Sequence, residues 1–153
     1  MIRKVYQVSV AAPKEKCVDI MLGLSNKSTY EQWTAVFNPT STYEGSWNTG
    51  EKIKFVGIDE NGKKSGMASR IAEHIPYTFV SIQHYGLYQD DVEITEGPSV
   101  DSWAGGLENY TYETVEETTN ITVEVDVTEE HLEYFDKTYP AALEKLKEVI
   151  ETT

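Results

Sequence analysis

Apolar residues near the N-terminus recur first with the two-residue period of a strand and then with the 3.6-residue period of a helix. Tyr6, Val8 and Val10 lie on one side of an alternating stretch, residues 3–12, which predicts a first strand. Pro13 suits the first position of a helix, because its fixed φ fits and its missing N–H is not needed there. A short helix is therefore expected after it, with an apolar face made by Cys17, Ile20, Met21 and Leu24.

A second short helix is predicted next. Ser28 and Glu31 have the spacing of a capping box, in which the two side chains bond each other's backbone N–H groups. Tyr30, Trp33 and Phe37 then follow at helical spacing and give this helix an aromatic face. The Asn-Pro pair after Phe37 should end it, since a residue before proline disfavours the helical conformation.

The middle of the chain has the period of strands. Asn61-Gly62 is a strong two-residue hairpin signal, and it would join strands over residues 51–58 and 64–75. Further strands are expected over residues 77–86, 108–117 and 120–127. In the last of these, apolar and polar residues alternate strictly, so one side should be buried and the other exposed to water.

A long helix is predicted over residues 128–151, with Asp126 or Thr128 as its candidate cap and a kink near Pro140. Its apolar stripe consists of Leu132, Phe135, Tyr139, Leu143, Leu146 and Ile150.

This order of elements predicts an α+β fold in which a curved antiparallel sheet wraps around the long C-terminal helix, with two short helices after the first strand. One amphipathic helix cannot cover a flat sheet of five or six strands, so the sheet must curl to hide its apolar side. A curled sheet leaves a hollow against the helix, which is where small ligands are usually held.

Size and composition fit one domain over residues 1–153. No run of apolar residues approaches the roughly 18 needed for a membrane span, and polar residues interrupt the N-terminal stretch, which disfavours a signal peptide. Cys17 is the one cysteine, so an intramolecular disulfide is impossible and a cytoplasmic location is the simplest expectation.

Charge is divided unevenly along the chain. Residues 1–86 contain 10 Lys or Arg against 8 Asp or Glu, whereas residues 87–153 contain 3 against 18. An acidic surface repels phosphate groups and anionic lipids, so neither nucleic acid nor a membrane surface is an expected partner. The alternative interpretation is that the charge serves solubility alone.

Three segments, residues 30–55, 66–86 and 135–151, resemble the START-like superfamily, also called SRPBCC, whose members have a helix-grip fold. The most similar branch is that of the C-terminal domain of the activator of the 90-kDa heat-shock-protein ATPase. The resemblance spans nearly the whole chain and implies binding of lipids, hormones, polyketides or other apolar molecules, with cyclisation or hydrolysis in a few members. Residues 87–106 depart from the pattern as a long acidic loop, and a role as lid stays open.

The candidate ligand-binding residues are those expected to face the hollow. Aromatic rings supply apolar area with few rotors to freeze, although they could equally fill the core. Tyrosine hydroxyls could orient a partly polar ligand or bond within the protein. Arg70 and His84 could meet an anionic group if they point inward, and are ordinary solvated residues otherwise. The set is Trp33, Phe37, Phe55, Met67, Arg70, His84, Tyr110, Tyr112, Phe135 and Tyr139.

Motifs for catalysis, metals and cofactors are missing from the sequence. There is no G-x-S-x-G elbow, no H-E-x-x-H and no phosphate-binding G-x-x-x-x-G-K-[ST] loop. The three histidines have no metal-ligand spacing, and Cys17 is expected to be a small buried hydrophobe. We therefore expect no catalytic residues, no metal and no cofactor.

Three classes of function are compatible with these patterns. The first is binding of a small apolar or aromatic molecule in the cavity. The second is a co-chaperone-like interaction module with a protein partner, and the third is an enzyme acting on a bound apolar substrate. The chain could be a monomer or a homodimer. A large apolar cavity would favour the first class, and a filled core with an exposed apolar patch would favour the second.

Overall fold

The computed structural model describes residues 1–153 as one curved sheet with three α-helices and a 3-10 turn. None of the helices is both long and apolar enough to cross a membrane. The elements in chain order are β1 (Ile2–Val10), α1 (Lys14–Leu22), α2 (Lys27–Thr34), β2 (Thr42–Gly45), β3 (Lys52–Ile58), β4 (Lys64–Ile75), β5 (Phe79–Gln89), β6 (Val92–Ile94), β7 (Gly106–Val115), β8 (Thr118–Val127), the 3-10 turn Glu129–His131 and α3 (Leu132–Thr152).

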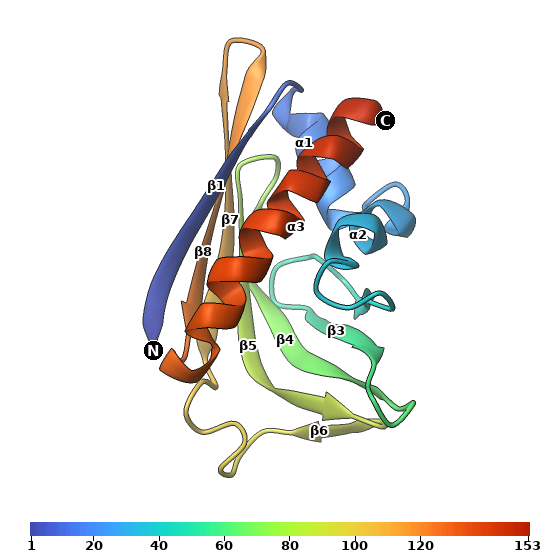
Figure 1. The fold of residues 1–153 in the computed structure, drawn as a ribbon, viewed down its shortest axis with the longest axis vertical. Helices are drawn as coiled ribbons and strands as arrows, with labels where there is room; N and C mark the ends of the chain where they lie inside the picture. The colour runs from blue at the N-terminus through green and yellow to red at the C-terminus, as the bar shows by residue number, and fades with distance from the viewer.

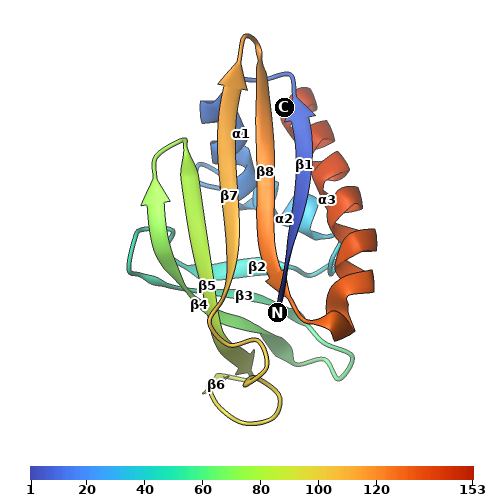
Figure 2. The same cartoon turned by 90° about the vertical axis from the view of Figure 1, so that its left-hand side faces the viewer.

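The eight strands form one antiparallel sheet in the order β1-β8-β7-β5-β4-β3-β2, with β6 paired to β5. The sheet curls, so that β2 and β3 run across the direction of β7 and β8 (Figure 2). Helix α3 lies along the inner side, with α1 and α2 beside it (Figure 1). The predicted α+β architecture, a curved antiparallel sheet around a long C-terminal helix, is therefore confirmed.

The core lies between β8, its neighbouring strands and α3. Every second residue of β8 is buried, as the alternation in its sequence predicts: Thr119, Ile121, Val123, Val125 and Val127. The buried residues of α3 lie in its second and third quarters and at its end: Tyr139, Ala142, Leu143, Leu146, Val149 and Ile150. Leu132 and Phe135, in the first turns, are only half-buried. The start of α3 is thus less completely packed than the rest of the helix.

All three helix starts differ from the sequence-based expectation. Helix α3 begins at Leu132 after the 3-10 turn, and neither Asp126 nor Thr128 caps it through a side-chain hydrogen bond. Pro13 is the N-cap of α1 and lies just outside the helix. In α2 the cap is Asn26, whose side chain accepts a hydrogen bond from the Ser28 backbone N–H at 3.0 Å. The predicted capping box of Ser28 and Glu31 is therefore wrong, because an earlier residue supplies the capping oxygen.

The Asn61-Gly62 hairpin is present between β3 and β4. Gly62 has a φ of +74°, a conformation that glycine adopts without strain. The Asp59 side chain accepts hydrogen bonds from the backbone N–H groups of Asn61 and Lys63, which holds the turn closed.

The loop predicted over residues 87–106 is shorter than expected. Strand β5 continues to Gln89, a turn follows, and β6 occupies Val92–Ile94, so the irregular part is residues 95–105. Within it Val100 is fully buried, and the Trp103 indole N–H donates to the Ser99 carbonyl at 2.8 Å. Pairing of β5 with β6 accounts for the difference, because hydrogen bonds between strands do not require regular apolar alternation.

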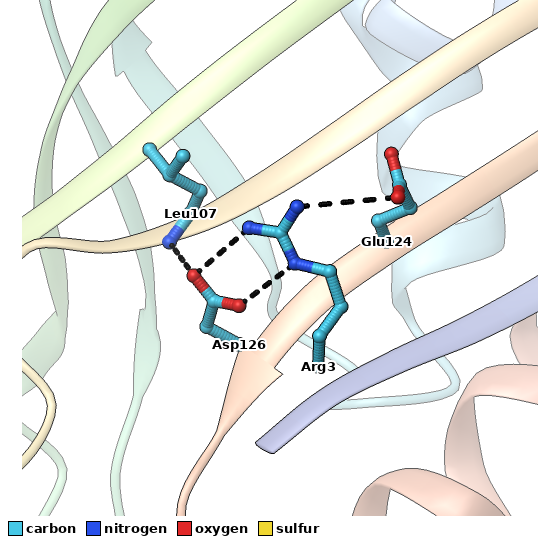
Figure 3. Close-up of polar contacts among 4 residues, drawn as sticks. All are labelled: Arg3, Leu107, Glu124 and Asp126. Carbon is cyan, nitrogen blue, oxygen red and sulfur yellow. Dashed lines mark hydrogen bonds and ion pairs between the residues drawn. The ribbon is translucent and has the colours of Figure 1, made fainter. Parts of the chain in front are cut away.

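One carboxylate joins three strands near the N-terminus. Arg3 on β1 donates to Asp126 on β8 through Nε at 2.9 Å and Nη2 at 3.2 Å, and the backbone N–H of Leu107 on β7 donates to the same carboxylate at 2.9 Å (Figure 3). Glu124 lies 3.9 Å from the guanidinium. The hydrogen bond from Arg3 lowers the pKa of Asp126 below its ordinary value, although partial burial acts in the opposite direction.

We expect Asp126→Ala to lower the free energy of unfolding by about 1 to 2 kcal/mol, because the variant leaves the Leu107 N–H and the Arg3 guanidinium without their acceptor. Arg3→Ala should cost less than about 1 kcal/mol, since this ion pair is partly exposed to solvent. Urea unfolding at neutral pH measures both.

The pH dependence of this effect has a definite sign. A lowered pKa means that the Asp126 carboxylate stabilises the fold above its ordinary pKa, and that this contribution disappears as the pH falls through the folded-state value. The difference between wild type and Asp126→Ala should therefore shrink in acid. Equal differences at neutral and acidic pH would contradict this assignment.

Candidate ligand-binding cavity

A cavity of about 480 Å³ lies between the inner side of the sheet and the first turns of α3. Its walls come from α2 and the segment after it, from β3, β4, β5, β7 and β8, and from the start of α3. Ser99 and Trp103 of the loop 95–105 lie on one side, and Thr128 and His131, between β8 and α3, lie on another. The cavity thus occupies the end of the molecule where α3 is least packed.

Aromatic rings dominate the wall. Phe37 and Tyr139 are in edge contact with centroids 5.1 Å apart, and Phe135 stacks near Tyr139 at 6.2 Å. Tyr30 of α2 and Phe55 of β3 also line the cavity, and the centroids of their rings are 6.3 Å apart. The aromatic lining residues are Tyr30, Trp33, Phe37, Phe55, Trp103, Tyr110, Phe135 and Tyr139. Such rings can enclose a flat apolar molecule with little loss of side-chain freedom.

The structure brings together eight of the ten residues predicted from the sequence. These eight line the cavity: Trp33, Phe37, Phe55, Met67, His84, Tyr110, Phe135 and Tyr139. They come from six different elements and the segment after α2, so only the folded chain places them around one space. Arg70 and Tyr112 are not among the lining residues.

Arg70 lies on the outer side of the sheet. Its neighbours Ser69 and Ile71 are fully buried, and alternation along β4 therefore directs Arg70 outward, where it is exposed. Its guanidinium sits 5.1 Å from the centre of the Tyr85 ring. The expectation that Arg70 faces a ligand is corrected: its contact is with a surface tyrosine.

Tyr112 points inward but lies in the filled part of the core. Its hydroxyl contacts the Met21 sulfur at 3.2 Å, and the side chain is almost fully buried. Because β7 runs past the cavity toward α1, Tyr110 reaches the cavity and Tyr112, two residues further along, does not. The expectation for Tyr112 is corrected accordingly.

A polar network crosses the inner wall of the cavity. His84 on β5 lies with Nε2 2.9 Å from Oε1 of Glu108 on β7, and the Tyr139 hydroxyl of α3 donates to the other carboxylate oxygen. The side chains of His84 and Glu108 are only 14% and 16% exposed. Glu108 was missed in the sequence. The available signal was its position, since it shares one side of β7 with Tyr110 and Tyr112.

Ionisation differs sharply within this network. Burial acts to raise the pKa of Glu108, but hydrogen bonds from His84, Tyr139 and Tyr110 outweigh it and hold the pKa below the ordinary value. Burial and the nearby Glu108 carboxylate raise the pKa of Tyr139 well above its ordinary value. At neutral pH the site therefore holds a carboxylate surrounded by neutral phenols.

Behind this wall, Ser69 holds the imidazole of His84 in place. Its hydroxyl lies 2.7 Å from His84 Nδ1 and is fully buried. The bonds to Ser69 and Glu108 engage both ring nitrogens and fix the orientation of the imidazole.

Other chemistry in the chain is limited. No group of three or more His, Cys, Asp and Glu side chains is arranged to hold a metal ion. Cys17 is fully buried in α1, and burial raises the pKa of its thiol. The cavity can therefore offer apolar contact, aromatic faces and hydrogen-bond acceptors to a ligand.

We expect Tyr139→Phe to lower the free energy of unfolding by about 1 to 3 kcal/mol, because the buried Glu108 carboxylate loses a donor. The control is Tyr134→Phe, at an exposed ring on the same helix, which should change stability by less than about 0.5 kcal/mol. Urea unfolding compares the two variants.

The same variant tests the ionisation of Glu108. Its lowered pKa stabilises the fold above the ordinary value, and this contribution is lost as the pH falls through the folded-state pKa. Loss of the Tyr139 hydroxyl should raise the folded-state pKa, so the stability difference from wild type should diminish in acid. A difference that grows in acid would show that Tyr139 does not act through an ionised Glu108.

No protein-family model matches the sequence, and no curated protein matches it either. Solved structures do match. A protein from Mesorhizobium loti has 13% identity and a TM-score of 0.72, covering 99% of this chain and 98% of that one. The Aha1 dimer from Colwellia psychrerythraea has 22% identity and a TM-score of 0.68, with 99% and 97% covered.

A third match is a protein of the dynemicin biosynthetic locus, with 13% identity and a TM-score of 0.67. It covers 98% of this chain, and this chain covers 47% of the longer neighbour. At such identities the similarity shows the fold alone. The protein has an Aha1-like, SRPBCC-type fold, as the resemblance in its sequence implied.

Proposed function

We propose that this protein binds a small apolar or aromatic molecule in the cavity between the curved sheet and the start of α3. The observation that supports the proposal is the cavity itself, about 480 Å³ of space walled largely by aromatic rings. Sites for small molecules are typically apolar hollows of a few hundred cubic ångströms with a few polar groups. The Glu108 network supplies those polar groups.

Packing energetics favour an occupant. Protein interiors are filled to the density of organic crystals, and side chains around a void lose the contacts they would otherwise make. The core around α1, β8 and the C-terminal part of α3 is filled with fully buried residues, so the open space is local. A ligand that fills it restores the missing contacts and stabilises the folded state.

Access to the cavity involves two irregular segments. Trp103 and Ser99 place the loop 95–105 against the cavity, and Thr128 and His131 do the same for the segment before α3. Ser99 and His131 are exposed, so the route from solvent passes between these segments. In this proposal the loop 95–105 covers the bound molecule.

The test replaces Leu87, a half-buried residue of β5 that lines the cavity, with tryptophan. Wild type should bind the neutral probe N-phenyl-1-naphthylamine, and Leu87→Trp should bind it at least about tenfold more weakly, because the larger side chain occupies the space at a stability cost below about 3 kcal/mol. Isothermal titration calorimetry measures affinity, and thermal unfolding shows that the variant is folded.

Leu107→Trp is the matched control, with the same substitution at a half-buried residue of β7 that does not line the cavity. It should bind the probe like wild type. Equal loss in both variants would show that binding depends on general destabilisation. Absence of binding by wild type would reject the proposed function.

A protein-interaction module is the second candidate. Two observations favour it: the fold similarity to the Aha1 dimer, and apolar side chains on the edge strand β1, where Val5 is 53% exposed. An edge strand offers unpaired backbone groups to another chain. In a homodimer through β1, light scattering should give twice the chain mass of 17.3 kDa, and Val5→Lys should return the monomer mass. A monomer mass for wild type at all concentrations rejects the homodimer.

A further inference from the structure

Glu108 is the charged group at the aromatic inner wall of the cavity. Its carboxylate lies between the rings of Tyr139 and His84, and the Phe55 ring is 6.0 Å from the His84 ring. Asp126 also borders the cavity, but Arg3 and the Leu107 backbone already bond both of its oxygens. A bound molecule would therefore meet one carboxylate that no Lys or Arg neutralises.

Hydrogen-bond donors around the cavity are mostly in use. The Tyr139 hydroxyl and His84 Nε2 serve Glu108, the Trp33 indole donates to the Met21 carbonyl at 2.9 Å, and the Thr34 hydroxyl donates to the Tyr30 carbonyl at 2.8 Å. The carboxylate oxygens of Glu108 keep free lone pairs, since each can accept about two hydrogen bonds. The wall thus favours a ligand group that donates.

Glu108 is an anionic group in this wall, because hydrogen bonds from His84 and Tyr139 hold its pKa below the ordinary value in spite of burial. Ser69, 2.7 Å from His84 Nδ1, fixes the orientation of the imidazole that contacts it. The carboxylate is buried among aromatic side chains, where the attraction for a cation is stronger than in water. A ligand carboxylate at the same place would be repelled.

The electrostatic field of the strands and loops around Glu108 is also negative. From residue 71 to residue 136 the chain contains no Lys or Arg, and this range includes β5, β7, β8, the loop 95–105 and the start of α3. Asp101, Glu129 and Glu130 are exposed in the two segments at the entrance. Carboxylates placed this way raise the local concentration of cations and speed their approach.

From these contacts we infer that the ligand carries a positively charged nitrogen, as in an amine attached to an apolar or aromatic body, and that Glu108 holds this nitrogen. This inference rests on the proposed ligand-binding function and specifies its ligand class. The ammonium donates to the carboxylate in a cavity also lined by the aromatic rings of Phe55 and Tyr110, and aromatic rings attract cations. The apolar body fills the space between α2, β3 and α3.

The experiment compares three ligands that share one ring system: 1-naphthylmethylamine, 1-naphthalenemethanol and 1-naphthaleneacetate. For wild type at neutral pH, titration calorimetry should show the amine binding about tenfold more tightly than the alcohol, and the acetate binding most weakly. The amine affinity should fall as salt is added. This ranking needs no variant, so it tests the inference even where a substitution disturbs folding.

Glu108→Gln then removes the charge while keeping the shape of the side chain. The preference for the amine over the alcohol should fall from about tenfold to within about twofold. Glu113→Gln is the matched control, because it removes the same charge from an exposed position on β7 and should preserve the preference.

The outcomes separate the two proposals. Binding of the alcohol and of N-phenyl-1-naphthylamine without an amine preference would overturn the inference and leave the ligand-binding function standing. An amine preference that persists in Glu108→Gln would also overturn it. Failure of all four molecules to bind would reject the ligand-binding function itself.

Discussion

One long helix, α3, and two short ones have to cover the inner side of an eight-stranded sheet, and the other features of this structure depend on that mismatch. Helix α3 packs tightly against β8 and β1 over its C-terminal part, where its buried residues lie. The sheet curls toward α3 to bury the rest of its apolar side, so that β2 and β3 cross the direction of β7 and β8 (Figure 2). Where the curl is widest and α3 is least buried, the side chains leave a cavity.

Tyr139 connects the packed core to this cavity. Its ring stacks on Tyr6 of β1 at 5.1 Å and meets the edge of Phe37 at the same separation, while its hydroxyl reaches Glu108. Burying a carboxylate is unfavourable unless donors surround it, and the fold places three around this one. In the proposed function this carboxylate takes part in recognition of the ligand.

The uneven charge of the chain also follows the architecture. Strands β5, β7 and β8 and the loop 95–105, which border the cavity, contain no Lys or Arg. Strands β3 and β4 also border it, and their Lys52, Lys54 and Arg70 lie over the rings of Tyr85 and Tyr88 on the outer side. The basic side chains of β3 and β4 thus point away from the cavity, and on the outer side Lys52 and Lys64 pair with Glu93 and Glu44.

Local patterns in the sequence determined most of the elements, though not β2 or β6. Alternation predicted β1, β3, β4 and β8, the Asn61-Gly62 pair predicted its hairpin, and an apolar stripe predicted α3. These depend on residues a few positions apart. Tertiary structure decided which residues meet in the cavity. His84 and Glu108 lie 24 residues apart along the chain, and Glu108 and Tyr139 lie 31 residues apart. An irregularity beside His84 shifts the pairing of β4 with β5, so that both His84 and Leu87 face the cavity. A shift of one residue reverses the side a residue faces, and it depends on the partner strand, which no local pattern contains.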